Sequence, residues 1–532
     1  MTATSPRGNE ARSARTDSGL AVPPYADAPD PPADVPPPGT YPYTRGTDAE
    51  GYAAHPQAQH AHAGSGTAVA TNARLRSLVA GGDTDFSLAF DLPTHLGYDA
   101  DNPLSAGEVG KTGVSLCTLD DMRLLLAGLP LAEMTPRLAV SAPAALVVLM
   151  YQIVAEERGA TPAQLRGAIR NDILAEYQAG GAYIFPPRAA LRLLTDTLAH
   201  SARHLPLWHP ITLSGSTLRE AGCSAAQEIA FSLSNAVAYI EAGRAAGLDV
   251  DELAPRLRFH FGVHSDLFEE VAKFRAARKL WATILREWFG AANPQSLMLR
   301  FHAETCASTL TAQQPHNNIV RATMQALAAM LGGAESLRTL AYDEPWGLPA
   351  TESATIAART RQILAAESGV GATIDPLGGS YYVESLTDAM EAEARRIMEG
   401  VARRGGVVAA TESGYIAGAI ADHAYAQATR TERGERVIVG INAHTEAAEP
   451  PAAIPRPDAA AERTQRERLI AHRAARNSIA CESALGVLRG AATGEGEMTT
   501  LLRSCLVAGA TLGEICATLR TAWGNYTAPR PI

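Results

Sequence analysis

The stretch that decides the fold is residues 86–110, FSLAFDLPTHLGYDADNPLSAGEVG. It begins as a short apolar run and continues into a segment rich in Gly, Pro and Asp, which is typical of a strand that ends in a loop. Residues 171–187 (NDILAEYQAGGAYIFPP) and 213–222 (LSGSTLREAG) repeat this strand-end pattern. The three blocks therefore predict chemistry at the ends of strands.

Short apolar stretches alternate with longer amphipathic segments between about residues 41 and 400. Three such pairs are 138–140 with 144–158, 212–214 with 223–246, and 258–261 with 267–289. Repeated strand–helix units imply parallel strands. Eight units predict an α/β fold of the (β/α)8 TIM-barrel type, with its active site on the loops after the strands. A doubly wound open sheet is the alternative that periodicity leaves open.

Composition shifts divide the chain into three parts. Residues 1–40 are rich in Pro, Ala, Asp and Ser, and such a segment is expected to be disordered. Residues 41–405 form the predicted barrel. Residues 406–532 are expected to hold one strand (VIVGI, 437–441), a Pro-rich linker (449–457), a charged helix (459–476) and a helical tail (479–523).

The overall composition narrows the functional class. The chain has 532 residues, of which 46% are hydrophobic, so it can bury a sizeable core. A formal net charge of −10 argues against a general nucleic-acid binder. There is no apolar run long enough for a membrane span and no N-terminal signal pattern, so a cytoplasmic location is expected. The six cysteines form no CxxC pair, and neither a zinc site nor another metal site is predicted.

Several further blocks extend the pattern: RAARKLWATI (275–284), FHAETCASTLTAQQPHNNIVRAT (301–323), AYDEPWGLP (341–349) and IDPLGGSYYVESLT (374–387). Together with the first three, they make residues 41–530 resemble the large catalytic subunit of the coenzyme B12-dependent acyl-CoA mutases, the methylmalonyl-CoA and isobutyryl-CoA mutase family. The resemblance implies a substrate-channelling barrel capped by a corrin. It also implies adenosylcobalamin as cofactor and an acyl thioester, on coenzyme A or another carrier, as substrate.

The resemblance also implies a partner. Single-chain mutases continue into a cobalamin domain with an Asp-x-His-x-x-Gly motif, and no such motif occurs here. The chain is therefore expected to act as split mutases do, in a hetero-oligomer with a small cobalamin-binding subunit.

The cofactor-facing positions of the family are largely retained. By similarity, apolar side chains pack the corrin, and carboxylates accept hydrogen bonds from ribose hydroxyls. Glu304 stands where the family has Gln, and Leu340 replaces an Asn near the adenosyl group. The residues expected to contact the cofactor are Phe90, Leu92, His95, Glu220, Glu304 and Glu344.

The catalytic positions are changed. Ser216 and Thr217 stand where the family carries a Tyr-His pair, and the family's His donates a hydrogen bond to the thioester carbonyl. Losing such a positioned acid costs on the order of 10²–10⁴ in rate. Thr217 keeps a hydroxyl donor of shorter reach, and Ser216 leaves space where the Tyr ring shields the radical. His62 aligns with a second family Tyr, which helps to displace the adenosyl group.

The substrate positions are changed as well. Gly180 replaces the Arg that pairs with the free carboxylate of methylmalonyl-CoA, which makes that substrate unlikely on sequence grounds. Ala89 lacks the Asp that marks the hydroxyisobutyryl-CoA branch, so that activity is not supported either. Arg170 stands at a Gln that contacts the thioester end, as either an anion clamp or a structural salt bridge. The expected substrate contacts are Ser87, Arg170, Gly180 and Arg256.

The loop around residues 55–64 departs furthest from the family. His55, Ala58 and His60 stand where an Arg, a Thr and an Arg grip the coenzyme A tail, and neutral imidazoles bind phosphates poorly. The histidine spacing matches no firm metal motif, so a flexible polar loop is favoured over a metal site.

Two hypotheses follow. The first is a radical mutase that carries out a 1,2 carbon-skeleton rearrangement of an unusual acyl thioester. The second is a catalytically degenerate mutase-like subunit or binding protein. Retained cofactor positions beside a rewritten substrate pocket favour the first, whereas Leu340 and His62 favour the second.

Overall fold

Parallel strands form the centre of the molecule in a computed structural model that describes residues 15–20, 36–49, 61–446, 459–494 and 496–529. One sheet has the order β1-β2-β3-β4-β5 and the other β6-β7-β8-β9, and every neighbouring pair is parallel. The strands are β1 (Ala61–Ala63), β2 (Asp85–Ala89), β3 (Thr135–Ala139), β4 (Gly167–Ile169), β5 (Trp208–His209), β6 (Ile211–Ser214), β7 (Leu257–Val263), β8 (Phe301–Thr305) and β9 (Ser336–Arg338). The α/β class with parallel sheets is confirmed.

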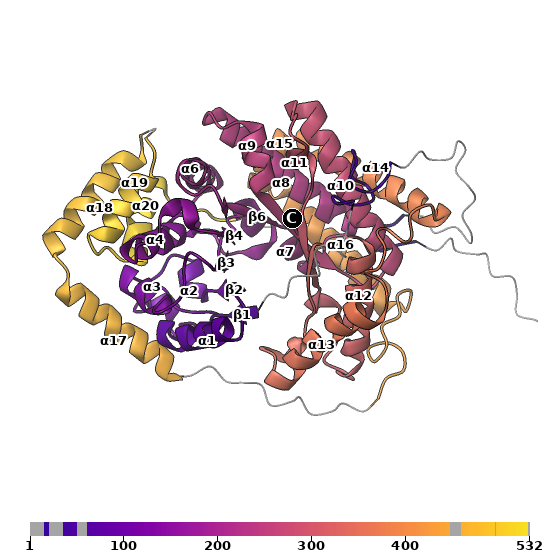
Figure 1. The fold of residues 1–532 in the computed structure, drawn as a ribbon, viewed down its shortest axis with the longest axis horizontal. Coiled ribbons are helices and arrows are strands. Elements are labelled where there is room, and N and C mark those ends of the chain that lie inside the picture. The colour runs from indigo at the N-terminus through magenta and orange to yellow at the C-terminus, as the bar shows by residue number, and fades with distance from the viewer. Residues whose placement is uncertain (1–14, 21–35, 50–60, 447–458, 495, 530–532) are drawn as a thin grey trace, which may run out of the picture.

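Helices surround the strands, as Figure 1 shows. Those that follow the strands include α1 (Ala68–Ala80), α2 (Leu92–His95), α3 (Leu119–Leu125), α4 (Ala144–Glu157), α5 (Ile173–Ala175), α6 (Pro187–His204), α7 (Gly215–Glu220), α8 (Ala225–Ala245), α9 (Val250–Leu253), α10 (Leu267–Phe289), α11 (Pro294–Leu297), α12 (Asn317–Leu331) and α13 (Thr351–Glu367). The later helices are α14 (Tyr381–Ala402), α15 (Gly406–Glu412), α16 (Tyr415–Glu432), α17 (Ala459–Ala475), α18 (Ser478–Ala492), α19 (Thr499–Val507) and α20 (Leu512–Trp523).

The two sheets are linked through the main chain. The backbone N–H of Thr212 in β6 donates to the carbonyl of Arg170, just after β4, at 2.9 Å. Only Pro210 separates β5 from β6, and proline has no N–H to continue a ladder. The break between the sheets is therefore local.

Alternation along the strands decides what lies inside. In β7, Leu257, Phe259 and Phe261 are buried, whereas Arg258 and His260 are partly accessible. β2, β3 and β8 show the same two-residue period. Since successive side chains of a strand point to opposite faces, the apolar set packs under the helices. The polar set lies on the opposite face of the sheet, away from the helices.

The C-terminal helices pack against the first half of the fold. Figure 1 shows α17 to α20 beside α3 and α4. Arg468 of α17 pairs with Asp121 at 2.8 Å, and Leu502 and Ile515 join the same apolar core as Phe86. The predicted helices over 459–476 and 479–523 are confirmed. The Pro-rich linker, 449–457, lies outside the described residues.

Two local expectations differ from the structure. The strand predicted over 437–441 is wrong, because only an isolated bridge between Val439 and Ala443 forms there. The three residues between the two bridge partners, 440–442, form a turn in which Gly440 adopts a positive φ of 84°. Disorder was predicted for residues 1–40. Of these, 15–20 lie against the helices instead, with the Ser18 N–H donating to Glu269 at 2.9 Å, while 1–14 and 21–35 lie outside the described residues.

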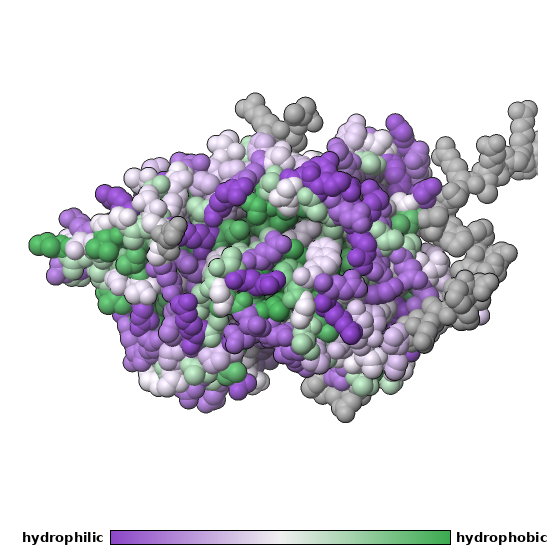
Figure 2. Space-filling model, turned by 90° about the horizontal axis from the view of Figure 1, so that it is seen from above, coloured by the Kyte–Doolittle hydropathy of each residue, from purple (hydrophilic) through white to green (hydrophobic). Residues whose placement is uncertain are grey.

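Polar and apolar side chains share the surface. Figure 2 shows apolar side chains gathered toward the middle of the face seen from above, with hydrophilic side chains around them. Among the described residues, no helix is both long and apolar enough to cross a membrane.

Candidate active site

The Ser216-Thr217 pair lies in α7, directly after β6. Ser216 is buried and Thr217 is half-buried. The helix is held from behind by Arg219, whose guanidinium donates to the carbonyl of Cys223 and to Glu270, the latter at 3.0 Å. Because Arg219 and Glu270 are both fully buried, this charge-assisted contact fixes where α7 presents its side chains.

The end of β4 is tied to β6 by a buried carboxylate. Asp172 accepts hydrogen bonds from the backbone N–H of Ser214 and from the hydroxyl of Tyr239, each at 2.6 Å. Burial raises the pKa of Asp172 to about 6, although both hydrogen bonds oppose that shift. The strand ends that carry Arg170 and Thr217 are thus joined.

Gly180 ends a π-helical turn, Glu176–Gly180, that follows α5. An added Cβ at Gly180 would overlap the carboxylate oxygen Oε2 of Glu176 and would lie 3.4 Å from Cγ2 of Thr217. The same carboxylate accepts a hydrogen bond from the N–H of Ala182 at 3.2 Å. Glu176 therefore occupies the space beside Thr217 that a side chain at position 180 needs.

Arg170 is the cation of this neighbourhood. Burial raises the pKa of Glu176, and the positive charge of Arg170 opposes the rise. Burial, reinforced by Arg170, lowers the pKa of His95 to about 4. His95 is therefore neutral at pH 7. Among the described residues, Arg170 makes no ion pair and no side-chain hydrogen bond.

A cavity of about 210 Å³ lies among the strands of both sheets. Its polar walls come from inward-facing residues of six strands and from Arg170. They are Ser87, Arg137, Arg170, Thr212, His260, His302, Glu304 and Arg338. Because the cavity opens among the strand ends that hold Arg170, it is the candidate substrate site.

An ionic network lines one side of this cavity. His260 Nε2 lies 3.0 Å from Glu304 Oε2, and Arg338 donates to Glu304. Arg338 also lies 3.7 Å from Glu344. Burial raises the pKa of Glu344 to about 7, against the charge of Arg338. The network thus combines an imidazole, a guanidinium and two carboxyl groups.

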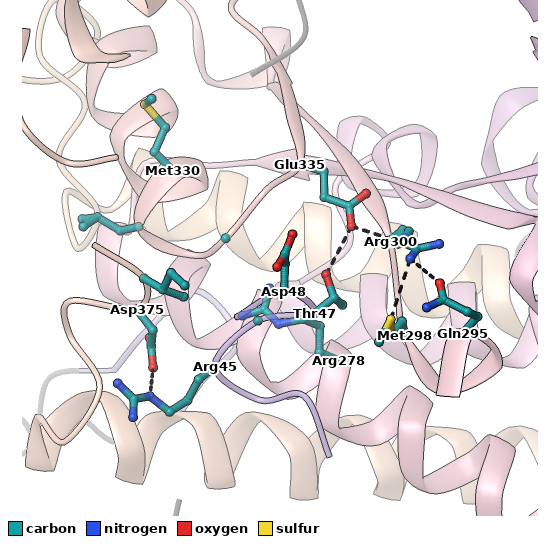
Figure 3. Close-up of a pocket in the computed structure, with 14 residues that line it drawn as sticks. Arg45, Thr47, Asp48, Arg278, Gln295, Met298, Arg300, Met330, Glu335 and Asp375 are labelled. Atoms are coloured by element: carbon teal, nitrogen blue, oxygen red, sulfur yellow. Dashed lines mark hydrogen bonds and ion pairs between the residues drawn. The ribbon is translucent and has the colours of Figure 1, made fainter. Parts of the chain in front are cut away.

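A larger cavity, about 530 Å³, lies at the other ends of the strands (Figure 3). Arg300 directly precedes β8 and Glu335 directly precedes β9. Their side chains are neighbours in the wall of this cavity, with Nε of Arg300 3.8 Å from Oε1 of Glu335. Arg45 and Asp375 form a second ion pair at 2.9 Å. Since the loops after the strands carry the predicted chemistry, this cavity is not the candidate active site.

The predicted cofactor residues occupy different settings. Leu92, at the start of α2, is exposed, whereas Phe90 is 2% exposed and belongs to the apolar core. Glu220 accepts hydrogen bonds from the N–H groups of Ala307 and Ser308, at 2.6 and 2.8 Å. Phe90 thus supports the site from below instead of offering a contact surface.

Orphaned acceptors test whether a sugar-bearing cofactor fits. Nδ1 of His95 and Oδ1 of Asp343, beside Glu344, are buried and have no hydrogen-bond partner among the described residues. Ribose hydroxyls and amides are donors that suit such atoms. The residues present therefore fit the adenosyl side of adenosylcobalamin. No group of three or more potential metal ligands is assembled among the described residues.

The structure brings together some predicted residues and separates others. His95, Arg170, Gly180 and Thr217 share one neighbourhood, and Ser87 and Glu304 line the adjoining cavity. Arg256 lies just before β7, at the opposite end of the strands, and donates to the carbonyl of Ser201 at 3.1 Å. The backbone of His62 pairs with Ser87 in register, while its side chain, like His55, Ala58 and His60, lies outside what is described.

Sequence reasoning missed Glu176, His260 and Arg338. The alternation of LRFHFGV in β7 carried a signal, since polar residues at every second position of a strand otherwise packed under helices must face the interior. Glu176 had no comparable signal, because its role depends on the absent side chain at position 180.

Comparison with known proteins identifies the family. A sequence model described as methylmalonyl-CoA mutase matches residues 17–525. The 2-hydroxyisobutanoyl-CoA mutase large subunit of Aquincola tertiaricarbonis is 42% identical, over 93% of this chain and 88% of its own. Methylmalonyl-CoA mutase of Escherichia coli (strain K12) is 40% identical, over 92% of this chain and 69% of its own. The methylmalonyl-CoA mutase large subunit of Propionibacterium freudenreichii subsp. shermanii is 39% identical, over 92% of this chain and 68% of its own. The chain belongs to the methylmalonyl-CoA mutase family, whose members are isomerases.

Proposed function

We propose that this chain is the large subunit of a split, adenosylcobalamin-dependent mutase that rearranges the carbon skeleton of an acyl thioester other than methylmalonyl-CoA. The observation that carries the proposal is the space beside Thr217. It is filled by the carboxylate of Glu176 and has no cation at Gly180. An acidic side chain with no cation beside it gives a substrate carboxylate no partner there.

The two sheets are inferred to close into one (β/α)8 barrel. β5 and β6 count as a single strand interrupted by Pro210, which gives eight strands. Support comes from the cavity, whose walls are contributed by residues of both sheets. A polar interior replaces the branched apolar layers that fill most such barrels, as a ligand-binding channel requires.

Adenosylcobalamin, when bound, supplies a carbon-centred radical by homolysis of its cobalt–carbon bond. The chain's own groups bind and orient. Glu304 and Glu344 accept hydrogen bonds from ribose hydroxyls, and exposed Leu92 offers apolar surface. Arg170 and Thr217 donate hydrogen bonds to the thioester carbonyl, and Ser216 leaves room for a bulkier acyl group.

The proposed partner is a small cobalamin-binding subunit, and the pair forms a hetero-oligomer in the cytoplasm. Several relatives are large subunits by name, which supports a two-chain arrangement. The exposed side chain of Leu92 lies at the strand ends that also hold His95, so that face is the proposed docking side.

The test combines this chain with adenosylcobalamin and a small cobalamin-binding subunit. Acyl-CoA thioesters with straight and branched acyl groups are added while the cobalamin spectrum and electron paramagnetic resonance are recorded. A substrate-triggered cob(II)alamin radical signal, with a rearranged product, is expected for at least one thioester other than methylmalonyl-CoA. Cobalamin capture without any radical signal overturns the proposal and favours a degenerate subunit.

A further inference from the structure

The cavity inside the strands contains an acid–base pair that radical rearrangement does not use. His260 of β7 and Glu304 of β8 both line it, and their side chains meet at 3.0 Å between Nε2 and Oε2. Nε2 is buried beside Glu304 at ion-pair distance, but the two groups make no formed hydrogen bond. A carboxylate so close favours the proton on Nε2, and the neutral ring then presents Nδ1 as a base.

The imidazole is held in place from the sides. The ring of His302 lies 4.9 Å from that of His260, at an angle of 58°. His302 is itself fixed, since its Nδ1 lies 2.8 Å from the hydroxyl of Ser336. A base with a locked orientation is what general base catalysis requires.

A cation holds the other oxygen of Glu304. Arg338 donates to Oε1 of Glu304, while Oε2 lies beside His260. The charged and titratable groups that face His260 come from four strand ends: Glu304 and His302 in β8, Arg338 in β9, Arg137 in β3 and Arg170 after β4. Arg137 is already paired with Asp85, at 3.2 Å.

Arg170 supplies the positive charge that an enolate oxygen needs. It lines the same cavity, and among the described residues its guanidinium makes no ion pair or side-chain hydrogen bond. A cation in the same cavity as a base stabilises negative charge that develops on an oxygen when a neighbouring C–H bond is broken.

We propose that the His260–Glu304 pair is a general base for the α-proton of an acyl thioester bound in this cavity, which gives the chain a cofactor-independent proton-exchange activity. His260 Nδ1 takes the α-proton, and the electron pair of the broken C–H bond forms the enolate, whose oxygen is held by Arg170. After the imidazolium exchanges its proton with solvent, return of a proton to the same face gives isotope exchange, and return after the enolate has turned its other face to His260 gives the epimer. At a stereogenic α-carbon the net reaction is epimerisation, and no oxidant or reductant is needed.

The substrate class rests on the proposed function, but the activity does not. The test therefore uses this chain alone, without cobalamin or a partner subunit. Isobutyryl-CoA and the two epimers of 2-methylbutyryl-CoA are incubated in D₂O, with their pantetheine thioesters in parallel. Mass spectrometry follows deuterium at the α-carbon, chiral analysis follows epimerisation, and calorimetry measures binding.

The expected result is enzyme-dependent exchange of the α-proton. His260→Gln should lower it on the order of 10²–10⁴-fold, the usual contribution of a general base. Glu304→Gln should lower kcat for exchange on the order of tenfold and leave KM nearly unchanged, because the positive charge that His260 gains in the step loses its anionic partner. His316→Gln, at an exposed histidine, should leave exchange unchanged.

Three outcomes overturn the inference. They are no binding of any thioester, binding without exchange above the buffer rate, and exchange that survives in folded His260→Gln. A radical mutase signal with no exchange would sink this inference alone. Exchange with no mutase signal would sink the proposed function alone.

Discussion

The carboxylate of Glu176 fills the space that a side chain at Gly180 would occupy. The two residues lie at opposite ends of one π-helical turn, so the carboxylate folds back across its own turn and bonds to the N–H of Ala182. This arrangement exists only because position 180 has no side chain. It turns a place that is suited to a cation into one that is lined by an acid.

Gly180→Ala should therefore destabilise the protein by about 1–3 kcal/mol, the usual cost of an overpacked site. In a Glu176→Ala background the same substitution should cost close to nothing, because the colliding oxygen is gone. Urea unfolding of the four proteins of this cycle measures the coupling.

The matched control is Gly486→Ala in α18, where an added Cβ meets nothing within 4 Å. It should stabilise the protein by about 0.5–1 kcal/mol through helix propensity. Equal costs of Gly180→Ala with and without Glu176 would show that the two residues do not share this space.

Replacing Arg219 should lower the free energy of unfolding, because Arg219 is half of a buried ion pair. Arg219→Met leaves the fully buried Glu270 with one cation fewer, and breaking a buried pair costs about 3–5 kcal/mol. Lys273, which also pairs with Glu270, should soften the loss. Urea unfolding should show the decrease, whereas Arg188→Met, at an exposed pair, should change the unfolding free energy by less than about 1 kcal/mol.

The elements that sequence predicted best are those with a strong period. The helix predicted over 267–289 is α10 to the residue, because it is a long run of helix-favouring residues without Gly or Pro and Asp266 caps its start. The strand predicted over 437–441 failed because VIVGI is apolar without being buried. Val437 and Val439 are exposed, and a β-favouring sequence gains nothing without a neighbouring strand to pair with.

The site was predictable as positions but not as chemistry. The strand-end blocks located Arg170, Gly180 and Thr217, which the fold brings together. The pairing of His260 with Glu304 required the register between β7 and β8, which sets His260 opposite His302 and Gly262 opposite Glu304. Sequence spacing alone does not fix a register between strands so far apart in the chain.

Thr217→His tests the role of the altered catalytic pair. A histidine beside Glu176 would be drawn toward that carboxylate, and its bulk would fill space meant for the acyl group. Turnover of the native substrate should fall by about tenfold or more. Thr217→Ser keeps the hydroxyl and serves as the control. Unchanged turnover in Thr217→His would contradict the assignment of Thr217 to the substrate site.

Glu344 should give the protein a measurable pH dependence. Its pKa is about 7 in the folded protein against a model-compound value of 4.5, so the folded state holds the proton more tightly. Below about pH 4.5 both states are protonated and the group costs nothing. Between there and about pH 7 the unfolded chain ionises first, so the free energy of unfolding falls by at most about 3 kcal/mol and is level above that range. Glu344→Gln removes the titration, and its stability relative to the native protein should therefore rise across pH 4.5–7. The exposed Glu241→Gln should follow the native profile throughout, and parallel curves for native protein and Glu344→Gln would rule out a raised pKa at this carboxyl.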